Sequence, residues 1–371
     1  MSFAHWQPHN TLCCFLFINK SLYRCMRLFF LILSSLLLCG LPVALAQQPV
    51  SATDYYIRGI QDLDNNKTDQ AIADFTEAVS LDPKLAGAYV KRGDILIAKG
   101  DFDAAAEDYQ KVLALIPGDE MVLHNLGYIQ LLKGNYEGAI SRFNEAIAVH
   151  GGMSVTYLDR GFARKAKGDL EGAISDYNKA LEINPELAEG YYNRAGTLGK
   201  EEAGAALADY SKAIEYKKEF AAAYFNRGAL RQAKGDLRGA VDDYTKAIEI
   251  NPQDTNAFVN RGLARKDLKD KGAIEDFDKA IEIDPHDAGA YLNRGAARQE
   301  SGDRRGALED YEQAIKIDPQ MARAYANRGI VRMEQGRYRE AIYDMEKAIS
   351  LDETLKTPLS DYIAKMKKRR I

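Results

Sequence analysis

The feature that most constrains this chain is a pattern of residues that recurs every 33 or 34 positions. One column of the pattern holds glycine in eight units and alanine in one: Gly59, Gly93, Gly127, Gly161, Ala195, Gly228, Gly262, Gly295 and Gly329. A second column is alanine throughout: Ala71, Ala105, Ala139, Ala173, Ala206, Ala240, Ala273, Ala307 and Ala341. A fixed period of this length is typical of arrays in which each unit buries its apolar face against its neighbours.

Each unit is predicted to form two helices. In residues 288–319 the first helix runs through "AGAYLNRGAARQES", Gly302-Asp303 makes a turn, and "RRGALEDYEQAIKI" forms the second helix before Pro319. Ala307, Tyr311 and Ala314 in the second helix fall at i, i+4 and i+7, which is the helical period. The small columns allow the two helices to approach closely, and the aromatic residues fill the space beside them.

The period and the columns of aromatic, Gly, Ala, aromatic, Ala and Pro resemble the tetratricopeptide repeat, over residues 52–355. The resemblance implies an all-α, right-handed superhelical solenoid of nine helix-turn-helix hairpins. It also implies that the first helices line a concave face where this family binds peptides or partner proteins. It does not identify the partner.

Residues 356–371 are expected to cap the last repeat. Leu359, Tyr362, Ile363 and Met366 fall on one helical stripe, and the helix ends in a basic cluster, where cations are favoured. The alternative is that this basic end contacts anionic lipid or nucleic acid.

An arginine column and an aspartate column accompany the repeat. Their members in the repeats discussed most below are Arg227 with Asp243, Arg261 with Asp276 and Arg294 with Asp310. The third unit has Leu126 and Arg142 at these two positions and so loses both charges together. We therefore predict a structural ion pair inside each of the other hairpins, with separately solvated charges as the alternative.

An asparagine precedes the arginine in the last five units: Asn193, Asn226, Asn260, Asn293 and Asn327. Asparagine is a poor helix former, so its recurrence in mid-helix requires a reason. By the resemblance, this column faces the groove, and its amides match the C=O and N–H of an extended peptide. Apolar neighbours would form the walls of the groove: Tyr192, Phe225, Val259 and Leu292. The alternative is that asparagine is only a compact polar residue on a wet surface.

The sequence contains few residues of the types that form catalytic or metal-binding sites. All four cysteines lie within residues 1–46, and the three later histidines, His124, His150 and His286, are far apart and are expected on the surface or in the groove. No metal-ligand spacing or phosphate-binding loop is present. The sequence therefore predicts no enzyme, no cofactor and no metal site. Residues 47–371 carry a net charge of −7, because the only charges in residues 1–46 are three basic ones, and this disfavours nucleic acid as a partner.

Residues 1–46 are interpreted as an N-terminal extension with a secretory signal. The segment from Met26, a possible start, has a positive beginning, an apolar stretch and Ala44-Leu45-Ala46, which suits cleavage before Gln47. Residues 47–51 would be a short linker, and the product would be exported to the periplasm. The alternative is an uncleaved inner-membrane anchor over residues 28–46.

Two functions follow from these observations. The first is a non-catalytic adaptor that holds an extended segment of a partner protein, expected in the cell envelope, in the groove. The second is a structural or assembly component that stacks on a copy of itself or on a larger complex. Units three, five and seven are irregular, five and seven being one residue short, and the sequence leaves open whether they bend the solenoid. Oligomeric state is also left open.

Overall fold

The computed structural model describes residues 50–368, and every regular element in that range is a helix. The expected signal in residues 1–46, most of the linker and residues 369–371 lie outside the described residues. The chain divides after Asp82 into two compact units, each described by itself.

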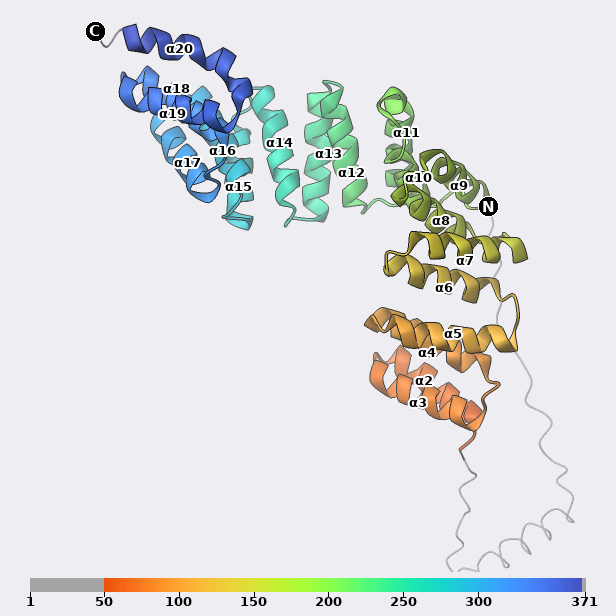
Figure 1. Ribbon diagram of the computed structural model, residues 1–371. Helices are drawn as coiled ribbons and strands as arrows, with labels where there is room; N and C mark the ends of the chain where they lie inside the picture. The colour runs from red at the N-terminus through yellow and green to blue at the C-terminus, as the bar shows by residue number, and fades with distance from the viewer. Residues whose placement is uncertain (1–49, 369–371) are drawn as a thin grey trace, which may run out of the picture. The chain divides into compact units, whose positions relative to one another are not determined.

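The first unit contains one hairpin, repeat one, made of α2 (Ala52–Asp64) and α3 (Thr68–Leu81). The second unit contains eight hairpins in chain order (Figure 1). These are repeats two to nine: α4 (Ala86–Lys99) with α5 (Phe102–Leu115), α6 (Glu120–Leu132) with α7 (Tyr136–Val149), α8 (Ser154–Ala166) with α9 (Leu170–Ile183), α10 (Ala188–Ala195) with α11 (Ala203–Tyr216), α12 (Ala221–Ala233) with α13 (Leu237–Ile250), α14 (Thr255–Asp267) with α15 (Gly272–Ile283), α16 (Ala288–Glu300) with α17 (Arg304–Ile317), and α18 (Ala322–Glu334) with α19 (Tyr338–Leu351). A last helix, α20 (Lys356–Lys368), follows repeat nine. Two short 3-10 helices, η1 (Lys200–Glu202) and η2 (Glu353–Leu355), directly precede α11 and α20. The array of helical hairpins predicted from the period is therefore confirmed.

Most hairpin turns share a glycine with a positive φ that is followed by a polar residue capping the second helix. In repeat four, Gly168 adopts a φ of +88°, which ends the first helix, and the carboxylate of Asp169 accepts a hydrogen bond of 2.9 Å from the N–H of Gly172 at the start of the second. The two short repeats depart from this pattern. In repeat five the first helix has only 8 residues, and in repeat seven the second helix has 12 residues where the other second helices have 14.

The core of each hairpin is formed by the small and aromatic columns. In repeat eight, Ala307, Tyr311 and Ala314 are completely buried. A Cβ atom built on Gly295 would lie 2.7 Å from Cε1 of Tyr311, so the tyrosine ring occupies the space that a larger residue would need. The glycine column therefore allows the first helix of each hairpin to pack directly against the aromatic ring of the second helix.

Arginine and aspartate columns meet inside each hairpin that carries them. Arg294 Nη2 donates to Asp310 Oδ1 at 2.6 Å, and the Asp310 side chain is only 2% exposed. The corresponding distances are 2.7 Å for Arg227 with Asp243 and for Arg261 with Asp276. Each of these hairpins thus has a charged pair linking its two helices.

Two further contacts of these groups go beyond the sequence prediction. A second arginine, four residues after the first, binds the same aspartate: Arg298 Nη1 lies 3.0 Å from Asp310 Oδ2. The first arginine also reaches back to the preceding hairpin, where Arg294 Nη1 donates to Asp278 Oδ1 at 2.6 Å. The arginine therefore joins neighbouring repeats as well as the two helices of one repeat.

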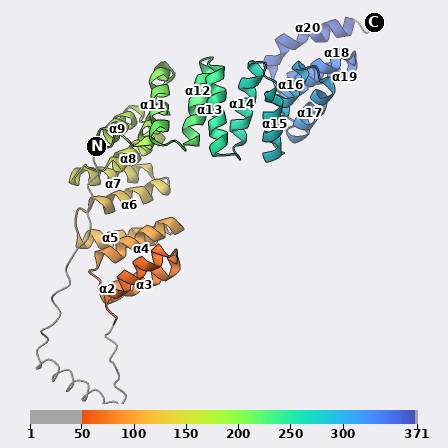
Figure 2. The ribbon, with the colours of Figure 1, turned by 180° about the vertical axis from the view of Figure 1, so that it is seen from behind.

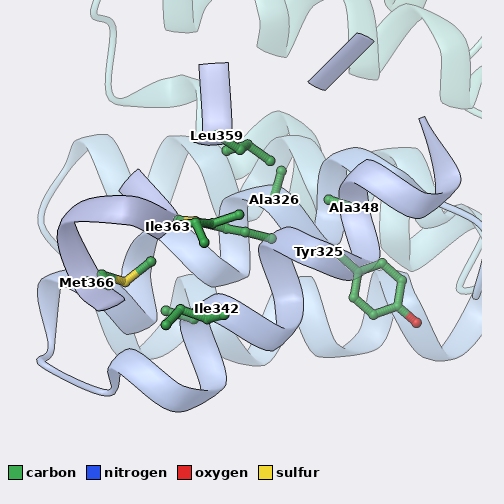
Figure 3. Packing of buried hydrophobic residues seen from close by; sticks show 9 residues of the cluster. Tyr325, Ala326, Ile342, Ala348, Leu359, Ile363 and Met366 are labelled. Carbon is green, nitrogen blue, oxygen red and sulfur yellow. The ribbon is translucent and has the colours of Figure 1, made fainter. Parts of the chain in front are cut away.

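Helix α20 covers the last repeat, and both views of the ribbon place it along α18 and α19 (Figures 1 and 2). Leu359, Ile363 and Met366 are 4%, 8% and 2% exposed and join the apolar cluster of repeat nine (Figure 3). Tyr362 was expected on the same stripe, but this was wrong, because it is not part of the buried cluster and is 42% exposed. Among residues 50–368, no helix is both long enough and apolar enough to cross a membrane.

Candidate functional site

Three of the predicted groove residues lie around one pocket in repeat five. The pocket has a volume of about 470 Å³ and is bounded by Tyr192, Asn193 and Asn226 together with Lys165 and Leu198. It exists because α10 ends at Ala195, so the chain between Gly196 and Gly199 is not helical where other repeats continue their first helix. Small residues from α10, α11 and α12 complete its wall.

Of the two asparagine amides at this pocket, one is hydrogen-bonded within the protein and the other is free. Asn226 Nδ2 donates to the hydroxyl of Tyr192 at 3.0 Å, so this amide is already partly engaged. The Asn193 side chain is half-buried and has no hydrogen-bond partner among residues 50–368. A partly desolvated amide without a partner favours a ligand that offers both a donor and an acceptor.

Lys165, from the preceding repeat, closes one side of the pocket. Its ammonium donates to the carbonyl of Gly196 at 2.8 Å, a carbonyl that is freed because α10 stops there. Burial lowers the pKa of Lys165. Sequence reasoning did not identify this lysine, and the available signal was the short turn of repeat five, "LGKEEAGAAL".

The other predicted groove residues are more engaged with the protein itself. Phe225 packs against Tyr244 with ring centroids 5.6 Å apart, and Val259 and Leu292 pack against the buried clusters of their repeats. Only part of the surface of these three side chains is therefore open to a partner, because the same side chains also pack inside their own hairpins.

The remaining asparagines are not equivalent. Asn260 donates to the carbonyl of Asn256 in its own helix at 2.9 Å. Asn327 lies near the hydroxyl of Tyr311 in the preceding repeat, and that hydroxyl donates to Gln299 at 2.8 Å. Asn293 has no hydrogen-bond partner among the described residues and matches Asn193 in this respect. The five asparagines thus lie at one position of the first helices, but within residues 50–368 Asn226 and Asn260 are hydrogen-bonded, whereas the amides of Asn193 and Asn293 are free.

The expectation for His124 was wrong, because this side chain is only 7% exposed between repeats three and four. Its Nδ1 lies 3.2 Å from Thr156 Oγ1, and its Nε2 lies 3.6 Å from Asp159 Oδ2. Burial lowers the pKa of His124 to about 4 and raises the pKa of Asp159 to about 7. The pair is a buried polar contact between repeats, and within residues 50–368 no group of three or more His, Cys, Asp or Glu side chains is placed to hold a metal ion.

Family models described as tetratricopeptide repeat or TPR repeat match most of the array. The matched residues are 58–120, 96–152, 161–201, 221–254, 269–302, 300–336 and 322–355. A search among curated proteins gave no match.

Several solved structures are similar to the chain. The C-terminal part of a TPR repeat-containing protein from Cytophaga hutchinsonii is 16% identical with a TM-score of 0.54, over 64% of this chain and 98% of that one. PilF from Pseudomonas aeruginosa is 21% identical with a TM-score of 0.50, over 59% of this chain and 96% of that one. YrrB, described as a TPR protein with an unusual peptide-binding site, is 26% identical over 49% of this chain and 95% of that one, with a TM-score of 0.46.

Proposed function

This chain belongs to the tetratricopeptide repeat family of protein-interaction scaffolds, and we propose that it holds an extended peptide segment of a partner protein along the first helices of repeats five to nine. The observation that carries this proposal is the pocket of repeat five, where the free amide of Asn193 lies beside the apolar surface of Tyr192 and Leu198. The protein acts by binding and has no catalytic role.

The geometry suits a peptide for two reasons. A half-buried amide can pair with a peptide C=O and N–H whatever the side chain attached to them, so it supplies affinity without a sequence requirement. The neighbouring pocket accepts one side chain of that peptide, and its small and apolar lining selects by size and polarity. Asn293, three repeats further along, offers a second free amide for the same backbone.

A pull-down tests this function. The mature protein starting at Gln47 is immobilised and exposed to an envelope extract, and the captured proteins are compared with those of an Asn193→Asp and Asn293→Asp double variant. We expect the captured partners to fall markedly, since aspartate removes both N–H donors, while circular dichroism shows an unchanged helix content.

The matched control is Asn184→Asp. Asn184 is the C-cap that follows α9, and it accepts a hydrogen bond from the N–H of Glu186, a role that aspartate fills at the equivalent positions 284 and 318. This variant should capture the same partners as the unchanged protein. Equal capture by the double variant would refute the peptide groove and would favour the assembly function, which light scattering would then reveal as a defined oligomer.

We further propose that the protein is exported, with cleavage before Gln47 and a partner in the cell envelope. The support comes from residues 26–46 alone. N-terminal sequencing of the product from a periplasmic fraction should give Gln47 as the first residue. A membrane-bound product that retains Met1 or Met26 would indicate an anchor instead.

A further inference from the structure

A second pocket lies at the hairpin turn of repeat seven, the other repeat that is one residue short. Its volume is about 790 Å³, and its floor is formed by Ala273, Ile274 and Ala297. These three side chains belong to, or pack against, the buried cluster around Phe277. The pocket therefore opens directly onto the hydrophobic core between repeats seven and eight.

The missing residue explains why this space is empty. In most other repeats the second helix begins with a large side chain: Phe102, Tyr136, Leu170, Leu237 and Tyr338. Tyr136 and Tyr338 pack against the apolar clusters of their own repeats. In repeat seven α15 begins at Gly272, so no such side chain is supplied. The pocket therefore corresponds to the place that Tyr136 and Tyr338 fill in repeats three and nine, whereas Leu170 at the same position of repeat four is 47% exposed.

The rim of the pocket carries positive charge that the protein does not neutralise. Lys269 and Lys271 are exposed and form no ion pair among residues 50–368. By contrast, the neighbouring charges are paired, with Lys266 Nζ 3.4 Å from Glu300 Oε1 and Arg265 Nε 3.7 Å from Asp270 Oδ2.

The backbone of Lys269 is strained. Its φ is +59°, a left-handed conformation that glycine occupies in the turns of most other repeats: Gly100, Gly134, Gly168, Gly235, Gly302 and Gly336. Lysine pays a steric cost there that glycine avoids. Lys271 directly precedes a helix N-terminus, where a cation is disfavoured. Both lysines thus oppose local stability, which is expected of residues kept for binding.

We propose that this pocket docks an acidic segment of a partner protein. One large apolar side chain of that segment, aromatic or leucine, enters the pocket and takes the place of the missing residue. Carboxylates on either side of it pair with Lys269 and Lys271. An anionic membrane is the competing occupant, and the vesicle sedimentation described below distinguishes it from the acidic segment.

This docking site is distinct from the proposed peptide groove. None of its lining residues belongs to the asparagine column or to the pocket of repeat five. The two proposals can therefore fail independently.

The test uses a fluorescein-labelled hexapeptide with two aspartates on each side of a Leu-Phe pair. Its fluorescence anisotropy is measured with the mature protein at low and physiological salt. We expect saturable binding that weakens as salt rises. A peptide with lysines in place of the aspartates, and one with Gly-Ser in place of Leu-Phe, should each bind at least about tenfold more weakly, as expected from the loss of charge pairs or of the buried side chain.

Two variants separate binding from folding. Lys269→Gly with Lys271→Ala removes both unpaired charges and the backbone strain, so binding should fall about tenfold while the melting temperature stays the same or rises. Inserting a leucine between Asp270 and Lys271 restores the normal turn length, which should fill the pocket, abolish binding and also raise the melting temperature. Loss of binding together with greater stability cannot come from unfolding.

Gly100→Lys is the matched control, because it places a lysine at the same left-handed position of repeat two, which has the normal length and contributes no residue to this pocket. It should lower the melting temperature without changing peptide affinity. Unchanged affinity in the two repeat-seven variants, or equal binding of the lysine peptide, would overturn the proposal. So would sedimentation with phosphatidylglycerol vesicles that depends on Lys269 and Lys271 while the peptide shows no binding.

Discussion

Replacing Asp310 by alanine is the sharpest test of what holds a hairpin together. The carboxylate of Asp310 is 2% exposed and accepts hydrogen bonds from Arg294 and Arg298 at distances of 2.6 to 3.2 Å. Its loss leaves two guanidinium groups without their shared partner, at 15% and 24% exposure. Breaking a buried charged pair costs about 3–5 kcal/mol, and because both arginines still reach water we expect the lower end, about 3 kcal/mol.

The assay is urea unfolding followed by circular dichroism, supplemented by amide hydrogen exchange. Hydrogen exchange is needed because repeat arrays can open locally, and the loss should be concentrated in α16 and α17. In a double-mutant cycle with Arg294→Leu, the coupling should be about 1–2 kcal/mol, since Arg298 still holds part of the carboxylate when Arg294 is gone.

Repeat three supplies the control for this prediction. Arg142 stands in its aspartate column, and within the described range 50–368 its one ion pair is with Glu145 on the surface, both side chains being more than 40% exposed. Arg142→Ala should therefore change the free energy of unfolding by less than about 0.5 kcal/mol. A similarly small effect of Asp310→Ala, or a coupling near zero, would refute the view that the charged pair locks the hairpin.

Three further predictions concern other parts of the scaffold. Gly295→Ala should cost about 1–3 kcal/mol in urea unfolding, because the new Cβ would lie 2.7 Å from the ring of Tyr311; no loss would mean that the ring moves freely. Met366→Ala should cost about 2–5 kcal/mol and promote aggregation, measured by unfolding and light scattering, since this side chain is 2% exposed under the cap. Asp159→Asn should create a new acid sensitivity. His124 then remains with a pKa of about 4, below its unfolded value, so the unfolded state binds more protons and stability falls as pH drops from about 6.5 to 4, by up to about 3 kcal/mol. In the unchanged protein the raised pKa of Asp159 means that the folded state takes up a proton as pH falls, which offsets the loss of stability caused by His124. If the melting temperatures of the unchanged protein and of Asp159→Asn depended on pH in the same way, the pKa shifts of His124 and Asp159 would be contradicted.

Much of the scaffold could be predicted because its determinants are local. The position of Gly295 relative to Tyr311 follows from the helical period and the turn length, and both can be counted along the chain. The joint loss of charge at Leu126 and Arg142 likewise pointed to the partner of each arginine. A second arginine column follows the first by one helical turn: Arg164, Arg231, Arg265, Arg298 and Arg332. Its spacing can be counted, but only the contacts in space show that each member binds the same aspartate.

The binding surface was less predictable. Counting placed five asparagines at one helical position, yet only contacts in space show that Asn226 is engaged by Tyr192 while the amide of Asn193 is free. The burial of His124 could not be predicted either, because it depends on Thr156 and Asp159 from the next repeat.

The sequence by itself determined that this chain is a series of helical hairpins, because a period of 33 or 34 residues with small and aromatic columns leaves each hairpin with faces that only a neighbouring hairpin can cover. It also showed that repeats five and seven are one residue short, but not what happens to the space beside each shortened turn. The tertiary structure alone decided that a pocket remains there. A residue missing from a turn removes a side chain from a contact among several helices, and whether the gap closes or remains as a pocket depends on how rigidly those helices are held by the rest of their repeats.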